Sequence, residues 1–245
     1  MTSIDYNHII ANGITLSTSG SSGVPKSFFQ SPKKIRASIE ASLYALYINQ
    51  DSKIYNVCSP TWAGGLFVMT MPGMNVGAEV VYEPFNPYEW TRRINGYTHS
   101  CLSAKQALII TKTKEFYNLN LDGIKISCGA EPVLWEVIEA FVDRGATFIP
   151  NWGMTEVGPL AIYSVFSNID AVREAKNEAP PNSTIIGDQK FCDYKVIDNE
   201  LYVKGDICVF DDWYATGDTV IVQNDTLYYT GRKNMEVDFW NPKKG

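Results

Sequence analysis

The sequence contains few residues of the kinds that bind transition metals or form disulfide bonds. It has two histidines and five cysteines, and the cysteines lie far apart in the chain, at Cys58, Cys101, Cys128, Cys192 and Cys208. No Cys-x-x-Cys pair is present, so a zinc site is not expected. An odd number of scattered cysteines is typical of small buried side chains in a reducing compartment. We therefore expect free thiols and a cytoplasmic protein.

Long apolar runs and an excess of basic residues are also missing. The longest apolar stretches are broken by Gly, Pro or charged residues, so none resembles a membrane-spanning helix of roughly 18 apolar residues. The N-terminal residues, MTSIDYNHII, lack the basic start and apolar stretch of a signal peptide. The formal net charge of −6 disfavours a nucleic-acid binder. We expect a soluble protein with no membrane or nucleic-acid partner.

Basic residues cluster at only two places in the sequence. The first cluster is Lys33, Lys34 and Arg36, and the second is Lys243 and Lys244. We interpret both as solvated charges, the first on a helix and the second in the C-terminal tail. Neither cluster therefore predicts a binding site.

A helix is predicted directly after a polar N-terminal loop. Ser31 is a suitable helix cap and Pro32 suits the first helical position. Five apolar residues that follow share one face at helical spacing: Ile35, Ile39, Leu43, Leu46 and Tyr47.

Short apolar segments then alternate with helical patterns. Strands are expected at residues 53–59, 78–83, 99–103, 124–129 and 146–151. Helical segments are expected at residues 66–73, 86–96, 104–117 and 132–145, the last with Pro132 at its start and Gly145 at its end. This alternation predicts an α/β fold with a mainly parallel sheet and flanking helices.

The pattern changes near residue 180, where the sequence APPN interrupts regular structure. Short strands are expected beyond it, at residues 183–187, 194–198, 200–205, 207–211, 219–223 and 226–231. Asp198–Asn199 and Asn224–Asp225 are predicted hairpin turns. We predict an α/β core over residues 1–180, a small β-rich, barrel-like subdomain over 181–232, and a hinge remnant with a tail over 233–245.

Residues 18–26, TSGSSGVPK, form a loop rich in Ser and Gly. Glycines let the backbone approach an anion, and successive N–H groups can surround it. Hydroxyl groups add donors, and Lys26 adds a positive charge. The loop differs from a Walker A motif, which has Gly directly before Lys, because Pro25 precedes Lys26 here. Taken alone, it fits either a phosphate-binding loop or a flexible connector.

The loop resembles the signature loop of the AMP-binding, adenylate-forming superfamily, which has the form TSG-[ST]-[ST]-G-x-PK and includes acyl-CoA synthetases, peptide-synthetase adenylation domains and luciferases. Further segments resemble motifs of that family in the family's order. They are SPTWAGGL at 59–66, CGAEP at 128–132, NWGMTE at 151–156, YATGD at 214–218 and GRK at 231–233. The resemblance therefore extends over nearly the whole chain.

The resemblance implies roles for individual residues. Nucleotide binding would involve Thr18, Ser19, Gly20, Ser21, Ser22, Gly23, Lys26, Gly129, Ala130, Glu131, Asn151, Trp152, Gly153, Met154, Thr155, Asp218 and Arg232. Among these, Trp152 would stack on the base and Asp218 would accept the ribose hydroxyls. The catalytic residues would be Lys26, Thr155, Glu156 and Arg232, with Thr18 and Glu156 holding Mg²⁺. Trp62, Gly64, Gly65 and Phe67 would line the acyl pocket, and Met69 beside them favours an apolar or aromatic acid.

The implied activity is that of a ligase that uses ATP and Mg²⁺ to convert a small carboxylic acid into acyl-AMP. A CoA thioester step, as in an acid–thiol ligase, would follow in many family members. Such proteins are about twice as long and carry a subdomain before the loop and a mobile lid after the hinge. Only residues 1–17 precede the loop here, and Gly245 follows the hinge closely. The alternative is therefore an AMP- or ATP-binding module without catalysis, or one that needs a lid-supplying partner chain, and we also consider a homodimer.

Overall fold

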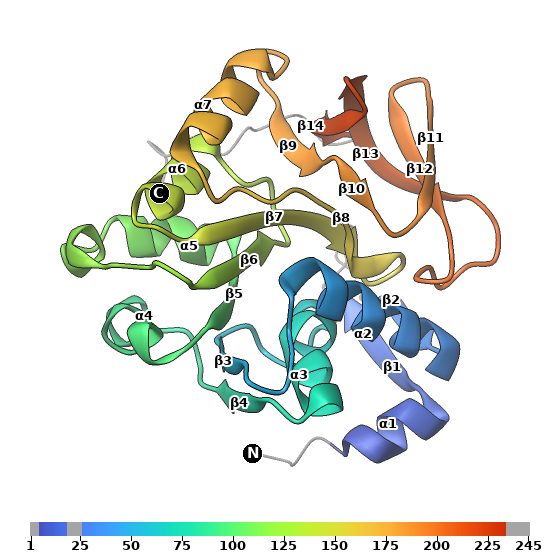
Figure 1. Ribbon diagram of the computed structural model, residues 1–245. Coiled ribbons are helices and arrows are strands. Elements are labelled where there is room, and N and C mark those ends of the chain that lie inside the picture. Colours follow the sequence, from blue (N-terminus) through green and yellow to red (C-terminus); the bar gives the residue numbers. More distant parts are fainter. Residues whose placement is uncertain (1–4, 19–25, 234–245) are drawn as a thin grey trace.

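The computed structural model describes residues 5–18 and 26–233 (Figure 1). Some of the predicted features lie outside these residues. They are the loop residues Ser19, Gly20, Ser21, Ser22 and Gly23, and the tail from residue 234 onward with Lys243 and Lys244.

A seven-stranded sheet forms the centre of the molecule. Neighbouring strands of β7, β6, β5, β3 and β4 pair in parallel, whereas β8 and β10 extend the sheet in antiparallel pairing. Its strands, in spatial order, are β10 (Gln189–Lys190), β8 (Gly158–Tyr163), β7 (Thr147–Met154), β6 (Lys125–Gly129), β5 (His99–Ser103), β3 (Lys53–Asn56) and β4 (Glu79–Tyr82). The five parallel strands coincide with the predicted ones, so the predicted α/β fold with a mainly parallel sheet is confirmed.

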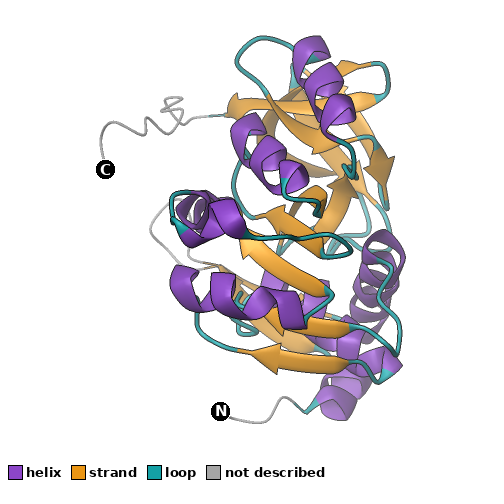
Figure 2. Ribbon diagram, turned by 60° about the vertical axis from the view of Figure 1, so that its left-hand side comes forward, coloured by secondary structure: helices purple, strands orange, loops and turns teal. Residues whose placement is uncertain are grey.

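Helices cover both faces of this sheet (Figure 2). One face packs against α4 (Pro87–Arg93), α5 (Ala104–Thr111), α6 (Trp135–Asp143) and α7 (Ile169–Glu178). The other face packs against α2 (Pro32–Leu46) and a π-helical segment, Gly65–Thr70, that continues into α3 (Met71–Val76). Strand β3 contributes to the hydrophobic cores on both faces of the sheet, because Ile54 faces α2 and Tyr55 faces α4 and α5.

The N-terminal part consists of α1 (Tyr6–Asn12) and a two-stranded antiparallel sheet. Its strands are β1 (Ile14–Thr18) and β2 (Lys26–Gln30). Leu16 and Ile9 pack against α2 through Ile35 and Ile39. This contact places the end of β1 and the start of β2 beside the main sheet.

Helix α2 begins as predicted, with the Ser31 side chain accepting a hydrogen bond from the Lys34 backbone and Pro32 in the first turn. Two side chains of this helix were predicted wrongly. Tyr47 adopts a left-handed cap conformation with φ 55° and is 63% exposed, so it is not part of the apolar face. Lys34 is buried and not solvated, whereas Lys33 and Arg36 are exposed.

Two predicted helix boundaries also differ from the structure. Helix α6 begins at Trp135, three residues after the predicted start at Pro132, because residues 130–134 form a loop that begins with Ala130 at φ 69°. The predicted helix over 104–117 is divided into α5 and a short 3₁₀ turn at Glu115–Asn118.

A separate antiparallel sheet of five strands forms the C-terminal part. In spatial order its strands are β11 (Asp193–Ile197), β12 (Glu200–Lys204), β13 (Tyr214–Gln223), β14 (Thr226–Arg232) and β9 (Thr184–Gly187). Both predicted hairpin turns are confirmed, with positive φ angles at Asp198, Asn199, Asn224 and Asp225. The predicted strand at 207–211 is wrong. This segment is a loop whose apolar residues Ile207 and Cys208 are buried in the core below the sheet.

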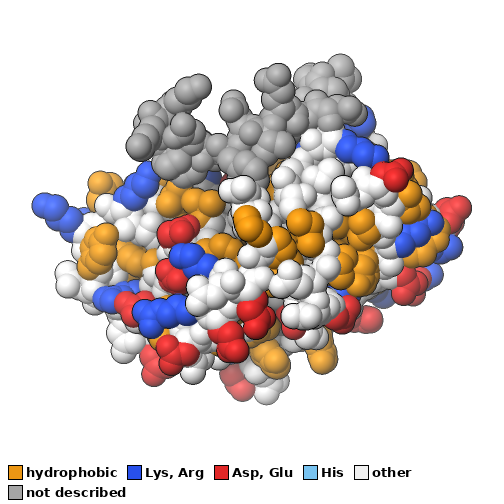
Figure 3. All heavy atoms as spheres, turned by 90° about the horizontal axis from the view of Figure 1, so that it is seen from above, with side chains coloured by type: hydrophobic (Ala, Val, Ile, Leu, Met, Phe, Trp, Pro, Cys, Tyr) orange, Lys and Arg blue, Asp and Glu red, His pale blue; other side chains and the backbone are white. Residues whose placement is uncertain are grey.

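Acidic and basic side chains are interspersed on the face seen in Figure 3. Apolar side chains lie between them. Within the described ranges, no helix is both long enough and apolar enough to span a bilayer.

Candidate functional site

A cavity of about 950 Å³ lies at the carboxyl ends of the parallel strands. Its walls come from the ends of β5, β6 and β7, from the segment after β3, and from β9, β13 and β14 of the second sheet. In open α/β sheets, ligands bind at this edge. The predicted site residues that line the cavity are Thr18, Lys26, Trp62, Gly64, Gly65, Gly129, Ala130, Glu131, Asn151, Trp152, Gly153, Met154, Thr155, Glu156, Asp218 and Arg232.

Thr18 and Lys26 enter the cavity from the β1–β2 sheet. They are paired residues in the antiparallel register, at the last position of β1 and the first of β2. The Thr18 hydroxyl donates to the Lys26 carbonyl at 3.5 Å. The sheet therefore presents a hydroxyl and an ammonium group at the point where residues 19–25 connect the two strands.

The turn after β6 is shaped by the close approach of β7. A Cβ atom on Gly129 would lie 2.5 Å from the Asn151 carbonyl oxygen, so a side chain is excluded there. The Asn151 amide is held between neighbours. It accepts a bond from Ser127 Oγ at 2.9 Å and donates to the Pro159 carbonyl at 3.0 Å.

Trp152 and Asp218 connect the two sheets across the cavity. The indole Nε1 donates to Asp218 Oδ2 at 2.9 Å. Asp218 Oδ1 lies 3.7 Å from Arg232 Nη1. Burial raises the pKa of the Asp218 carboxyl, while the Trp152 and Arg232 contacts oppose this rise. The carboxylate therefore faces the cavity with one oxygen bound to the indole and the other next to a guanidinium group.

The Thr155–Glu156 turn is fixed from behind by three groups that were not predicted for the site. Lys34 Nζ and Gln30 Nε2 both donate to the Thr155 carbonyl, at 2.8 and 3.2 Å. The Val209 backbone donates to the Glu156 carbonyl at 2.8 Å. Burial lowers the pKa of Lys34 to about 7, although Cys208 and Glu156 act in the opposite direction.

One sequence signal for Lys34 was available. Ser38, Ser42 and Ala45 follow it at spacings of three or four residues, and all are buried. Small side chains on one helix face indicate close packing against a neighbour, and Lys34 lies on that face.

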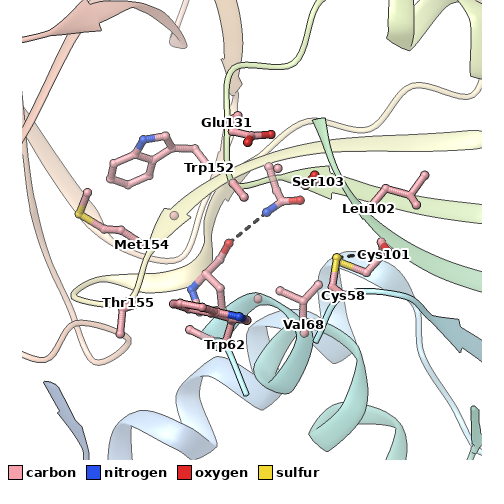
Figure 4. Close-up of a pocket in the computed structure, with 18 of the residues that line it drawn as sticks. Cys58, Trp62, Val68, Cys101, Leu102, Ser103, Glu131, Trp152, Met154 and Thr155 are labelled. Atoms are coloured by element: carbon pink, nitrogen blue, oxygen red, sulfur yellow. Dashed lines mark hydrogen bonds between the residues drawn. The ribbon is translucent and has the colours of Figure 1, made fainter. Parts of the chain in front are cut away.

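One part of the cavity is lined by neutral side chains. Val68, Cys101, Leu102 and Cys58 lie together there, and Cys58 Sγ donates to the Cys101 carbonyl at 3.4 Å (Figure 4). Trp62 is half exposed at the cavity wall. Phe67, which was predicted for the acyl pocket, is not among the lining residues, and neither is Met69.

Phe67 lies in a different part of the core because the π-helical segment turns it toward the N-terminal part. It is 1% exposed and packs with Ile9, Leu16 and Ile35. The next residue, Val68, lines the cavity in its place.

Metal binding by protein ligands alone finds no support in the described part of the chain. No group of three or more His, Cys, Asp or Glu side chains there is arranged to hold an ion. The two predicted metal ligands, the Glu156 carboxylate and the Thr18 hydroxyl, do line the same cavity. That donor set fits Mg²⁺ in phosphate sites, where one or two carboxylates act together with phosphate oxygens and water.

Comparison with solved structures shows the same fold. The chain resembles the adenylation and carrier unit of McyG in complex with phenylalanyl-adenylate, with a TM-score of 0.78 and 18% identity, over 91% of this chain and 47% of that one. It resembles the adenylation domain of a keto acid-selecting peptide-synthetase module bound to keto acyl adenylate, with a TM-score of 0.76 and 17% identity, over 89% and 51% of the two chains. It also resembles ATP-bound MatB from Rhodopseudomonas palustris, with a TM-score of 0.74 and 14% identity, over 89% of this chain and 47% of that one.

The chain thus spans about half the length of these structures. No curated protein matches the sequence. The family model described as AMP-binding enzyme matches residues 15–217. This match covers the loop at Thr18, the cavity-lining segments of the parallel sheet and most of the second sheet, so the chain belongs to the AMP-binding enzyme family.

Proposed function

We propose that the protein binds ATP with Mg²⁺ and adenylates a small carboxylic acid, forming acyl-AMP and releasing pyrophosphate. One observation carries this proposal. Separate parts of the chain bring Thr18 with Lys26, Thr155 with Glu156, and Asp218 with Arg232 to a single cavity. The arrangement combines phosphate-binding groups, a carboxylate for a cation and a carboxylate for a sugar.

The reaction is an in-line displacement at the α-phosphorus. A carboxylate oxygen of the acid forms a bond to phosphorus while the bond to the bridging oxygen of pyrophosphate breaks. Lys26 neutralises phosphate charge, and the Thr155 hydroxyl orients the α-phosphate. Asp218 accepts the ribose hydroxyls, and Arg232 adds a positive charge beside them. These groups act by positioning and electrostatic stabilisation.

Glu156 and Thr18 would hold the Mg²⁺ ion. The ion supplies charge neutralisation at the phosphates when it is bound. Trp152 lies at the carboxyl end of β7 and would stack on the adenine.

The neutral part of the cavity supports an acid with an uncharged tail. Among the described lining residues, the charged ones are Lys26, Glu131, Glu156, Asp218 and Arg232. All five belong to the nucleotide-binding motifs, which leaves Val68, Leu102 and Trp62 for the acyl group. A small aryl or short acyl acid fits these side chains. The proposal extends to a second step, in which the acyl group is transferred from acyl-AMP to CoA.

The test is carboxylate-dependent release of pyrophosphate from ATP over a panel of aryl, short-chain and dicarboxylic acids. We expect release with at least one neutral acid. Substituting Glu156→Gln should lower the rate by at least a hundredfold, because the proposed cation site loses the carboxylate assigned to it. Glu115→Gln is the matched control, since Glu115 is exposed and does not line the cavity.

Two results would contradict the proposal. AMP binding without release for any acid would favour a nucleotide-binding module without catalysis. Unchanged turnover in Glu156→Gln would remove Glu156 from the cation site.

A further inference from the structure

Two adjacent lysines in the first turn of α2 have opposite environments. The Lys33 side chain is 75% exposed and pairs with Asp206 at 2.7 Å. Lys34 is 3% exposed, and its amine lies against the backbone of the Thr155–Glu156 turn. A lysine amine is rarely buried unless it has a specific partner, because removing the charge from water is costly.

Hydrogen bonding alone does not account for the amine of Lys34. Its partner, the Thr155 carbonyl, also accepts a bond from Gln30 Nε2 at 3.2 Å. The carbonyl would therefore keep a donor if the amine were absent. An apolar side chain of similar length would fill the same space without the cost of a buried charge.

The position of the amine relative to the cavity suggests what the charge does. Thr155 and Glu156 line the cavity, whereas Lys34 is not among the lining residues and lies on the other side of their backbone. The ionisable groups that face Lys34 are Cys208 and Glu156. A positive charge behind the turn attracts the Glu156 carboxylate and any anion bound in front of it, and it acts strongly because little water screens it.

We propose that Lys34 is a positioning residue of the nucleotide site. Its buried ammonium group holds the Thr155 carbonyl, fixes the turn that carries Glu156, and strengthens binding of phosphate-bearing ligands on the cavity side. This inference rests on the proposed function, because it takes the ligand in front of Thr155 to be a nucleotide phosphate.

The test compares Lys34→Met, Lys34→Arg and Lys33→Met. The first removes the buried charge, the second keeps a charge and donors, and the third makes the same charge change at the exposed neighbour. Binding of AMP, of ATP with Mg²⁺, and of adenosine is measured by calorimetry at pH 6, where the Lys34 amine carries its charge, together with the melting temperature of each variant.

Lys34→Met should bind AMP and ATP at least tenfold more weakly than the wild type, while its affinity for adenosine changes by less than about twofold. Its melting temperature should equal or exceed that of the wild type, because a buried charge has been replaced by an apolar group. Lys34→Arg should recover most of the phosphate-dependent affinity. Lys33→Met should bind all three ligands as the wild type does.

Two different failures can be told apart. If the wild type binds AMP and ATP, and Lys34→Met binds them equally well, the role of Lys34 is overturned and the proposed function stands. Equal loss of AMP and adenosine in Lys34→Met, with a lowered melting temperature, would show a merely structural role and also overturn the inference. If the wild type binds neither AMP nor ATP, the proposed function itself fails, and this inference fails with it.

Discussion

His99 is a buried ionisable side chain at the start of β5. It is 2% exposed, and its Nε2 lies 2.9 Å from the Leu46 carbonyl. Because a carbonyl only accepts, Nε2 carries a proton, and Nδ1 faces the Thr98 hydroxyl at 2.7 Å. Burial lowers the pKa of His99 from 6.5 to about 4, with Lys125 acting in the same direction and the Leu46 bond against it. The imidazole is therefore neutral in the folded protein at neutral pH.

This environment predicts a dependence of stability on pH. Between about pH 6.5 and 4 the unfolded chain binds the proton more strongly than the folded protein, so the free energy of unfolding falls as the pH is lowered. The upper limit for the loss is roughly 3 kcal/mol. Urea denaturation at several pH values measures it. His99→Asn should show a smaller dependence than the wild type, and His8→Asn, at an exposed position, should show the same one. An unchanged dependence in His99→Asn would contradict this account.

The hydrogen bond between Trp152 and Asp218 has a stability consequence of its own. Trp152→Phe keeps an aromatic ring but leaves Asp218 Oδ2 without its indole donor. The free energy of unfolding should fall by about 1–3 kcal/mol at neutral pH, as expected when a buried charged group loses a partner. Chemical denaturation measures the change. Trp213→Phe serves as the comparison, since Trp213 lies outside the cavity. Equal effects of the two substitutions would argue against a specific bond.

At the scale of residues, all the described residues that the sequence motifs predicted for the site line the cavity except Phe67, because each motif stays together on one strand end or turn. Lys34, Gln30 and Val209 were not predicted as contacts of the Thr155–Glu156 turn. They are distant from the turn in sequence, and only tertiary packing brings them to it. The motif also did not predict that Val68, and not Phe67, lines the cavity. Both residues lie in the π-helical segment, and the motif does not indicate which of two adjacent residues this segment turns toward the cavity.

At the scale of elements, the hairpin between β11 and β12 depends on two residues with left-handed backbone. Asp198 has φ 49° and Asn199 has φ 61°. Asn tolerates this conformation and Gly adopts it freely, whereas Ala does so at a cost. Asn199→Ala should therefore lower the free energy of unfolding by about 1 kcal/mol, and Asn199→Gly should leave it nearly unchanged or raise it. Thermal denaturation checks the pair, and an equal effect of both substitutions would contradict the turn geometry.

Elements with strong local signals were predicted well. The five parallel strands and the start of α2 carry apolar runs or capping residues that act within a few positions. The 207–211 segment was predicted as a strand because its apolar residues imitate one. Its burial comes from packing below the second sheet and not from strand pairing. Strand β8 and helix α7 were not predicted. Strand β8 pairs with β7 in antiparallel orientation, so its place in the sheet depends on a contact with another strand.

At the scale of the whole molecule, two sheets of different type meet around one cavity. The parallel sheet supplies Gly129, Asn151 and Trp152, and the antiparallel sheet supplies Asp218 and Arg232. The bond between Trp152 and Asp218 joins the two sheets at the site. Relative movement of the sheets would therefore change the contacts that a nucleotide receives. Sequence motifs predicted both halves of this site, but not the bond that connects them.

In the proposed reaction, a carboxylate attacks the α-phosphorus of ATP in this cavity. The most direct measurement uses a carboxylic acid labelled with a heavy oxygen isotope and mass spectrometry of the nucleotide products. We expect acyl-AMP as the first product. When water attacks the carbonyl carbon of acyl-AMP, the AMP that is released retains one labelled oxygen from the acid. Formation of unlabelled AMP only, or of ADP and phosphate, would contradict the proposed reaction.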